Sequence, residues 1–322
     1  MCDQVPEFDN EAIAKIMQEH YGIKGEITPL VSFEDQNARI KTPNGSYVLK
    51  VANKRVEVES LEMQTEVLEH LKAKAPKLGV PDVVPSLGGE NIIVVDGFLV
   101  RLLTYLEGDL LVGVDRSPEL YNDLGHFMGR FTKAMDGYSH GGSNKPDDLW
   151  LLDNVMLCKA HIEDVEKGEL YDRVLRFYNH YEENIVPKLK PLRGAVLHND
   201  ANEQNLLASL DGMPHITGII DFGDLGYGTL INELAVTIAY ALLGEDNTQM
   251  ASSEIIKGYV QEFPLEEAEL EIIFDMVAMR LVQSVVMACH RAKDFPDNKY
   301  ILVSQKPIRM LLKKLDDKIL KL

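Results

Sequence analysis

Residues 198–224 constrain the fold of this chain more than any other segment. His198, Asp200 and Asn205 stand in the pattern H-x-D-x-x-x-x-N. An apolar run over residues 216–220 then leads into Asp221-Phe222-Gly223, a turn whose glycine leaves the aspartate carboxylate exposed. A chain that folds around this segment presents two carboxylates and one amide at the ends of short strands.

These three groups suit the transfer of a phosphoryl group. Such a reaction needs one carboxylate to accept the proton of the acceptor hydroxyl, and an amide and a second carboxylate to hold Mg²⁺ against nucleotide phosphates. We therefore interpret Asp200 as the catalytic base and Asn205 and Asp221 as the Mg²⁺ ligands. An aspartate alone in a turn would not indicate a catalytic base. The spacing of Asp200 to His198 and Asn205 supports that interpretation. His198 is expected to fix the loop through backbone hydrogen bonds.

The first third of the chain has the pattern of a small antiparallel sheet with helices. Pro43-Asn44-Gly45 is a strong turn signal between two strand-like runs. We predict a nucleotide-binding lobe over residues 1–107, with helices at 9–19 and 57–74 and strands at 27–31, 38–41, 47–51, 92–95 and 98–104.

The remainder, residues 108–322, is predicted to form a mainly helical catalytic and substrate-binding lobe, so the fold class is α+β. Short strands at 206–209 and 215–220 carry the motif. The expected helices span residues 118–135, 153–166, 169–189, 230–243, 252–262, 265–291 and 306–322.

Lys50 follows Tyr47-Val48-Leu49 on the third predicted strand, where kinase-type centres place the lysine that holds the α and β phosphates. That lysine usually pairs with an acid of the next helix, and here Glu62 and Gln64 are equal candidates. The phosphate-covering segment, residues 33–37, has no glycine, so backbone N–H groups and the side chains of Gln36 and Asn37 are expected to cap the phosphates.

The composition, with 45% hydrophobic and 26% charged residues among 322, is globular and suggests about two lobes. The net charge of −18 argues against nucleic acid or an anionic membrane as partner and is compatible with a cationic substrate. The polar start, the expected lack of a membrane-spanning stretch and three separated cysteines predict a cytoplasmic protein.

These residues resemble the aminoglycoside phosphotransferase and choline kinase superfamily, whose fold is two-lobed and protein-kinase-like. The resemblance runs from about residue 27 to residue 300. Several strings are similar to its hydroxylysine kinase branch in particular, namely those at 33–37, 47–50, 100–106, 219–224 with Tyr227-Gly228, and 283–288.

The resemblance implies an enzyme that phosphorylates the 5-hydroxyl of 5-hydroxy-L-lysine with GTP, or ATP, and Mg²⁺. It implies that the nucleotide base lies against the connector formed by Thr104, Tyr105 and Leu106. One departure is Asn199, where the family commonly has glycine; asparagine tolerates unusual backbone angles, so we expect the loop to survive.

A hydroxylated diamino acid has two ammonium groups and one carboxylate. Asp224 and Glu233 are therefore candidates to bind the ammonium groups, and Arg280 to bind the carboxylate in a bidentate way, with ordinary ion pairs as the alternative. Other acceptors remain open: homoserine, choline, ethanolamine or an aminoglycoside. A catalytically inactive nucleotide-binding protein would lack Lys50, Asp200 or Asp221, and a protein kinase would carry an A-P-E segment after Asp221-Phe222-Gly223.

Overall fold

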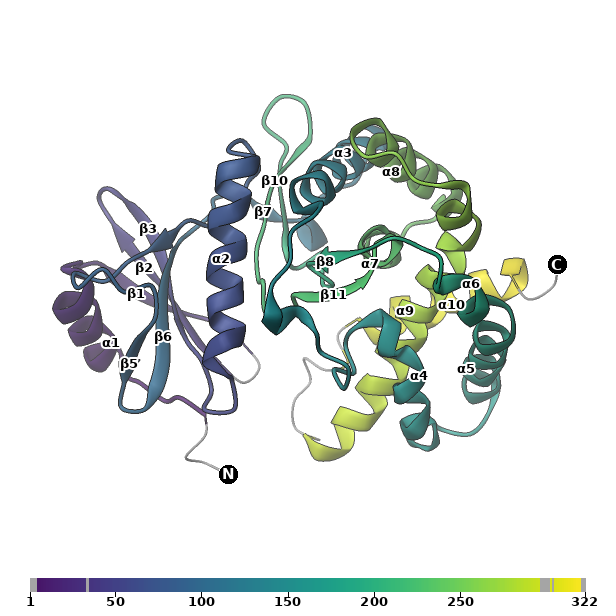
Figure 1. Cartoon of the computed structure of the whole chain (residues 1–322), viewed down its shortest axis with the longest axis horizontal. Coiled ribbons are helices and arrows are strands. Elements are labelled where there is room, and N and C mark those ends of the chain that lie inside the picture. The colour runs from purple at the N-terminus through teal and green to yellow at the C-terminus, as the bar shows by residue number, and fades with distance from the viewer. Residues whose placement is uncertain (1–4, 33–34, 296–301, 303, 320–322) are drawn as a thin grey trace. The chain divides into compact units, whose positions relative to one another are not determined.

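The computed structural model describes residues 5–32, 35–295, 302 and 304–319 (Figure 1). The chain divides into two compact units. The first comprises Met1–Gly108 with Thr217–Gly223, and the second comprises Asp109–Ile216 with Asp224–Leu322. Each unit has its own hydrophobic core and is described by itself.

The first unit is built on an antiparallel sheet, as predicted. Its strand order is β1-β2-β3-β6-β4, and β5 also pairs with β6. The Pro43-Asn44 turn joins β2 to β3 with Thr42 opposite Gly45, which confirms the predicted hairpin. The strands are β1 (Glu26–Leu30), β2 (Gln36–Thr42), β3 (Gly45–Val51), β4 (Val83–Val84), β5 (Ile93–Val95) and β6 (Phe98–Thr104).

Two helices accompany this sheet. α1 (Asn10–Ile16), capped by Asp9, continues into a π-helical turn at Met17–Tyr21, and buries Ile13 and Ile16 among sheet residues. α2 (Val58–Lys74) buries Leu61, Leu68 and Leu71 on one side. Because Ile13 and Ile16 are three positions apart, and Leu61, Leu68 and Leu71 are seven and then three apart, the apolar residues recur with the helical period that predicted both helices.

The segment Thr217–Gly223 packs in the first unit, whereas the sequence prediction placed it in the second lobe. It includes most of β10 (His215–Ile219), and the backbone N–H of Ile219 donates to Gly79 O at 2.9 Å. A Cβ on Gly79 would lie 1.8 Å from Thr217 O, so only glycine permits this approach. Asp221 is thereby attached to the unit that carries Lys50.

The second unit is mainly helical. Its central helix α7 (Ile231–Ala241) is buried at every position. The other helices are α3 (Pro118–Met135), α4 (Val155–Cys158), α5 (Glu169–His180), α6 (Val186–Leu189), α8 (Thr248–Glu262), α9 (Glu267–Asp294) and α10 (Gln305–Ile319).

Three local predictions in this unit were incomplete. The predicted helix 153–166 is broken into 3-10 turns on both sides of α4, and 169–189 contains a π-helical turn between α5 and α6. The antiparallel pair β8 (Gly194–Leu197) and β11 (Gly226–Thr229) was not predicted, because strands of four residues give little periodic signal. β7 (Asp109–Leu110) pairs with β9 (Leu206–Ser209).

α9 also corrects the expectation about membrane-spanning stretches. By length and composition its residues 267–293 pass the test for a membrane span, but 83% of the most apolar window is buried inside the protein. The apolar character of α9 is explained by packing against other helices of the second unit, α7 and α10 among them (Figure 1).

Candidate active site

The loop after β8 turns sharply at Asn199, which adopts a left-handed conformation with φ of 64°. The positive φ agrees with the expectation that asparagine accommodates an unusual backbone angle in this loop. Its side chain adds contacts that glycine lacks, because Asn199 Nδ2 donates to the carbonyls of Leu197 (3.3 Å), Asp224 (3.1 Å) and Gly226 (3.3 Å). The asparagine thus joins the loop to the chain that follows Asp221-Phe222-Gly223.

Asp200, the candidate base, is held by three donors. Its Oδ2 accepts from Asn202 Nδ2 at 2.9 Å and from Asn205 Nδ2 at 2.8 Å, and its Oδ1 accepts from an Arg280 guanidinium nitrogen at 3.1 Å. The side chain is 23% exposed. Asp200 therefore combines a fixed orientation with access for a substrate hydroxyl.

Asn205 directs its amide nitrogen to Asp200, donating to the carboxylate and to the Asp200 backbone carbonyl at 2.9 Å. The amide oxygen consequently points away from Asp200. A hard oxygen donor in this orientation fits a Mg²⁺ ligand.

Arg280 lies beneath Asp200, not at an open surface. It is 1% exposed and also donates to Trp150 O at 3.0 Å and to Gln283 Oε1 at 2.9 Å. Its guanidinium lies 5.5 Å from the ring centroid of Trp150 and 5.4 Å from that of Tyr240. These contacts make Arg280 a support for Asp200, whereas the sequence suggested that it binds the substrate carboxylate.

Glu233 is also placed differently from its prediction as a substrate-binding acid. It is fully buried on α7, and its Oε2 accepts from the backbone N–H of His198 at 2.6 Å. Burial raises the pKa of Glu233 to about 7, against the lowering effect of the backbone N–H groups of His198 and Asn199. Glu233 therefore holds the loop after β8 through the backbone N–H of His198, and because it is buried it cannot contact a substrate.

His198 is fully buried, with its ring edge-on to Phe131. Its Nδ1 is 3.3 Å from the backbone N–H of Asp200, in keeping with the expected role in fixing the loop. Asp224 is partly exposed. Of the three candidate substrate-binding residues, it alone is accessible to solvent.

In the first unit, Lys50 Nζ lies 3.1 Å from Asp221 Oδ1. Asp221 has a φ of 63°, a strained angle for a residue other than glycine, and its side chain is 52% exposed. A turn that holds an exposed carboxylate beside a lysine offers an oxygen ligand for a cation and a positive charge for a phosphate.

The predicted pairing of Lys50 with Glu62 or Gln64 is wrong in this structure. Gln64 Oε1 instead accepts from Arg101 at 2.8 Å, and both side chains are buried. Arg101 is the cross-strand neighbour of Lys50 on β6. Burial lowers the pKa of Arg101 to about 10, with Asp35 and Asp221 opposing the change. Gln64 thus supports a second cation next to Lys50.

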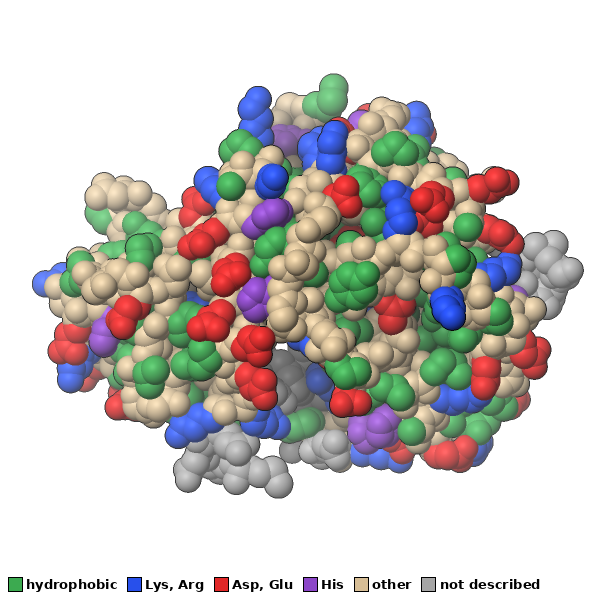
Figure 2. Space-filling model, viewed as in Figure 1, with side chains coloured by type: hydrophobic (Ala, Val, Ile, Leu, Met, Phe, Trp, Pro, Cys, Tyr) green, Lys and Arg blue, Asp and Glu red, His purple; other side chains and the backbone are tan. Residues whose placement is uncertain are grey.

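Glu62 is exposed on α2. Figure 2 shows acidic side chains gathered over this helix, whose exposed positions include Glu59, Glu62, Glu66 and Glu69. Glu62 therefore belongs to a solvated acidic face of α2, and the described residues show no hydrogen bond or ion pair between Glu62 and Lys50.

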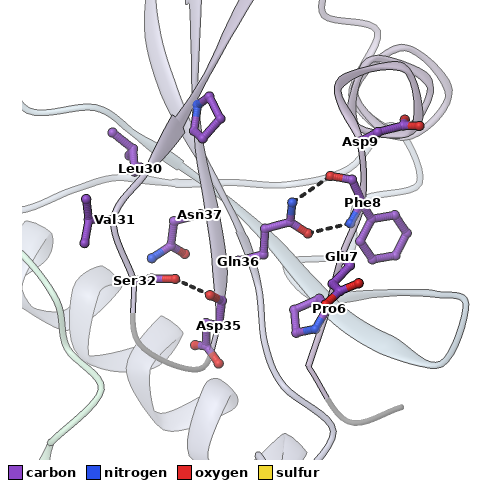
Figure 3. A pocket seen from close by; sticks show the side chains of 11 residues that line it. Pro6, Glu7, Phe8, Asp9, Leu30, Val31, Ser32, Asp35, Gln36 and Asn37 are labelled. Carbon is purple, nitrogen blue, oxygen red and sulfur yellow. Dashed lines mark hydrogen bonds between the residues drawn. The ribbon is translucent and has the colours of Figure 1, made fainter. Parts of the chain in front are cut away.

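Part of the predicted phosphate-covering segment, residues 33 and 34, lies outside the described residues. Gln36 does not face a phosphate site, because its amide bonds the backbone N–H and carbonyl of Phe8 at 2.8 and 2.7 Å (Figure 3). Asn37 Oδ1 is buried without a hydrogen bond among the described residues. An open pocket lined by residues 6–9, 29–32 and 35–37 lies beside this segment (Figure 3).

The connector predicted to face the nucleotide base follows β6. The N–H groups of Thr104 and Tyr105 donate to Asp82 O and Ser46 O, both at 2.9 Å. Arg39 stacks on the Tyr105 ring at 3.8 Å. These contacts hold the connector on the sheet of the first unit.

Four residues near the candidate site residues of their own unit were missed from the sequence: Arg101 in the first unit, and Trp150, Tyr240 and Glu203 in the second. Glu203 lies between Asp200 and Asn205 in the chain, is 5% exposed, and has its pKa raised by burial. Trp150 is the single tryptophan of the chain, so the sequence alone could have singled it out as a candidate. Arg101 and Tyr240 become recognisable only through Gln64 and Arg280, which are distant from them in the sequence.

Known proteins with similar sequences or folds are phosphotransferases and kinases. A profile described as the phosphotransferase enzyme family matches residues 26–268. The chain is 30% identical to hydroxylysine kinase of Xenopus laevis over 332 residues, which cover 94% of this chain and 88% of that protein. It is 29% identical to hydroxylysine kinase of Mus musculus over 335 residues, covering 94% and 87%.

Among solved structures, an amicoumacin kinase in complex with AMP-PNP and Ca²⁺ is similar, with a TM-score of 0.72 and 19% identity. The similarity covers 97% of this chain and 94% of that one. It confirms the predicted α+β, protein-kinase-like fold.

Proposed function

Because the chain belongs to the phosphotransferase enzyme family, we propose that it transfers the γ-phosphoryl group of GTP or ATP to the hydroxyl of 5-hydroxy-L-lysine. The chain is a small-molecule phosphotransferase acting on an alcohol group. The hydroxylysine kinases of two vertebrates, similar over most of its length, support the choice of acceptor. The amicoumacin kinase bound to AMP-PNP supports a nucleoside triphosphate as donor.

The observation that carries the proposal is the set of three donors around Asp200. A carboxylate fixed by Asn202, Asn205 and Arg280, yet partly exposed, is suited to orient a substrate hydroxyl and accept its proton. The hydroxyl oxygen then forms a bond to the γ-phosphorus while the bond from that phosphorus to the bridging oxygen breaks. The nucleoside diphosphate leaves with the bridging oxygen, and the proton remains on Asp200.

Lys50 would hold the α and β phosphates, with Asp221 and Asn205 as Mg²⁺ ligands. When bound, Mg²⁺ would neutralise charge on the phosphates. Asp221 and Asn205 belong to different units, so their binding of one ion is inferred from the sequence motif. The base of the nucleotide would lie against residues 104–106. The N–H groups of Thr104 and Tyr105 already donate to backbone carbonyls, so the nucleotide base would contact Leu106 and the backbone carbonyls of this segment.

Acceptor recognition would fall to Asp224, which is partly exposed and three residues after Asp221. Its carboxylate would bind an ammonium group of the substrate. Glu233 and Arg280 would act on the loop and on Asp200 instead, because both are buried and bonded within the protein.

The test is release of nucleoside diphosphate, measured with GTP and ATP in parallel. The acceptors are 5-hydroxylysine, homoserine, choline, ethanolamine and kanamycin. We expect turnover with 5-hydroxylysine well above the others. Preference for another acceptor would retain the phosphotransferase and reject hydroxylysine, and nucleotide binding without turnover on any of them would indicate a catalytically inactive protein.

A further inference from the structure

A second group of chemically capable side chains lies in the second unit, on elements that the catalytic assignment does not use. His161 and Asp164 belong to the 3-10 helix η6 (Lys159–Asp164), and His290 belongs to the C-terminal part of α9. η6 continues from α4 and packs on α9, and Figure 1 shows α4 beside this helix.

The local structure explains why the three side chains meet. In a 3-10 helix, side chains three residues apart project from the same edge, so His161 and Asp164 share one face. His290 reaches this face from α9, where its Nδ1 lies 2.7 Å from Asp164 Oδ2. The rings of His161 and His290 stack with centroids 3.8 Å apart.

One potential ligand atom from each residue lies within 4.8 Å of the other two. Zinc bonds of about 2.0–2.1 Å place tetrahedral ligands about 3.4 Å apart, so rotation of these side chains would close the set. Two imidazoles and one carboxylate suit Zn²⁺, whereas Mg²⁺ prefers oxygen ligands. We propose that His161, Asp164 and His290 bind Zn²⁺, with water as fourth ligand, and thereby join η6 to α9.

Lys293 is the competitor of the metal. Its ammonium group is paired with Asp164 Oδ1, one helical turn after His290. The lysine side chain is 60% exposed and can turn into solvent, while Asp164 is 18% exposed and stays in place. Because Lys293 already holds a positive charge at Asp164 Oδ1, it opposes the binding of a dication at the same carboxylate, and its removal separates a metal site from a simple ion-pair network.

The experiment is calorimetric titration of the full chain, with any histidine tag removed, using ZnCl₂ in excess MgCl₂. Wild type should bind one Zn²⁺. His161→Gln and His290→Gln should each weaken Zn²⁺ binding about tenfold or more. Loss of a contact that supports a metal ligand already weakens binding about tenfold or more, and loss of the ligand itself should cost at least as much. Lys293→Gln should tighten binding roughly twofold to fivefold, because it removes an exposed competing ion pair.

His180→Gln is the matched control. His180 lies in the same unit and bonds Asp275 at 2.8 Å with similar exposure, but the described residues offer it no second imidazole. This variant should bind Zn²⁺ as wild type does. Thermal unfolding provides a second readout, since Zn²⁺ should raise the Tm of wild type and leave that of His290→Gln unchanged.

The proposal is overturned if wild type does not bind Zn²⁺ under these conditions, or if His161→Gln and His290→Gln bind it like wild type. Equal weakening by His180→Gln would show adventitious zinc on surface histidines only. Unchanged or weaker binding by Lys293→Gln would show that Lys293 does not compete with the metal for Asp164. None of these outcomes depends on the acceptor or donor of the phosphoryl transfer.

Discussion

At the scale of single residues, the region around Asp200 shows how neighbours define a role. Asp200, Glu233 and Asp224 are all acids near the catalytic motif, but the first is fixed by three donors, the second is buried under the loop and the third is partly exposed. The same functional group can therefore act as a base, a structural anchor or a binding group, depending on burial and partners.

Asp200→Asn removes the group proposed to accept the hydroxyl proton and keeps its shape. We expect turnover to fall by about 10²- to 10⁴-fold, the usual contribution of a general base, with nucleotide affinity close to wild type. The Tm should fall as well, because the amide loses the charge that pairs with the buried Arg280 and keeps one acceptor oxygen for three donors. Asp211→Asn, in an exposed turn, is the control. Turnover retained in Asp200→Asn would assign the base role elsewhere.

Glu233→Gln tests the buried anchor through pH. The folded-state pKa of Glu233 is raised to about 7, so folding favours the protonated form. This contribution to stability is complete below about pH 4.5 and is lost as the pH rises towards 7, by roughly 3 kcal/mol at most. Wild type should therefore lose stability between pH 5 and pH 8, relative to Glu233→Gln, which stays neutral.

The measurement is the urea midpoint of both proteins at pH 5, 6, 7 and 8. A difference between wild type and Glu233→Gln that stays constant across this range would show that Glu233 does not titrate there.

At the scale of elements, α9 positions residues that support Asp200, and glycines allow helices of the second unit to pack closely. Arg280 and Gln283 lie one turn apart on α9, and Gln283 Nε2 bonds the carbonyls of Leu149 (2.7 Å) and Leu151 (3.2 Å). α9 and the segment around Trp150 thus form one support for Asp200. On another side of this unit, α3 and α8 approach closely at Gly125 and Gly258.

Arg280→Lys keeps the positive charge but loses the planar set of donors. If Arg280 supports Asp200, the kcat should fall by about tenfold to a hundredfold while the KM for the acceptor changes little. If it binds the acceptor carboxylate instead, the KM for 5-hydroxylysine should rise with little change in kcat. Steady-state kinetics on this variant separates the two roles.

Gly258→Ala tests the crossing of α3 and α8. An added Cβ would lie 2.0 Å from Asn122 O, so the helices must separate, at a cost of about 1–3 kcal/mol. We expect a lower Tm. Gly113→Ala is the control, because a Cβ there meets no atom within 4 Å; an equal loss in both variants would contradict close packing as the cause.

At the scale of the whole molecule, the residues proposed for catalysis and for the support of Asp200 are divided between two units. Lys50 and Asp221 lie in the first, and Asp200, Asn205 and Arg280 lie in the second. Only three positions in the chain separate Asp221 from Asp224, so the boundary between the units passes through the motif itself. Asp221, the proposed metal ligand, and Asp224, the proposed acceptor-binding residue, are therefore in different units although they are close in the chain.

Asp221→Ala and Asn205→Ala test whether one Mg²⁺ ion is shared. Each variant should weaken nucleotide binding in the presence of Mg²⁺ and have little effect with EDTA. If both residues bind the same ion, the double variant should lose much less than the combined losses of the single variants, because interacting ligands are not additive. Additive losses would indicate separate roles.

By itself, the sequence determined the order of most helices and strands, the hairpin at Pro43-Asn44, and the grouping of Asp200, Asn205, Asp221 and Lys50 as candidates. Periodicity, turn residues and motif spacing are local properties, so they can be read along the chain. Only the tertiary structure decided that Gln64 pairs with Arg101, that Glu233 and Arg280 support the loop, and that Thr217–Gly223 packs in the first unit. These outcomes depend on burial and on partners far apart in sequence, which no local pattern specifies.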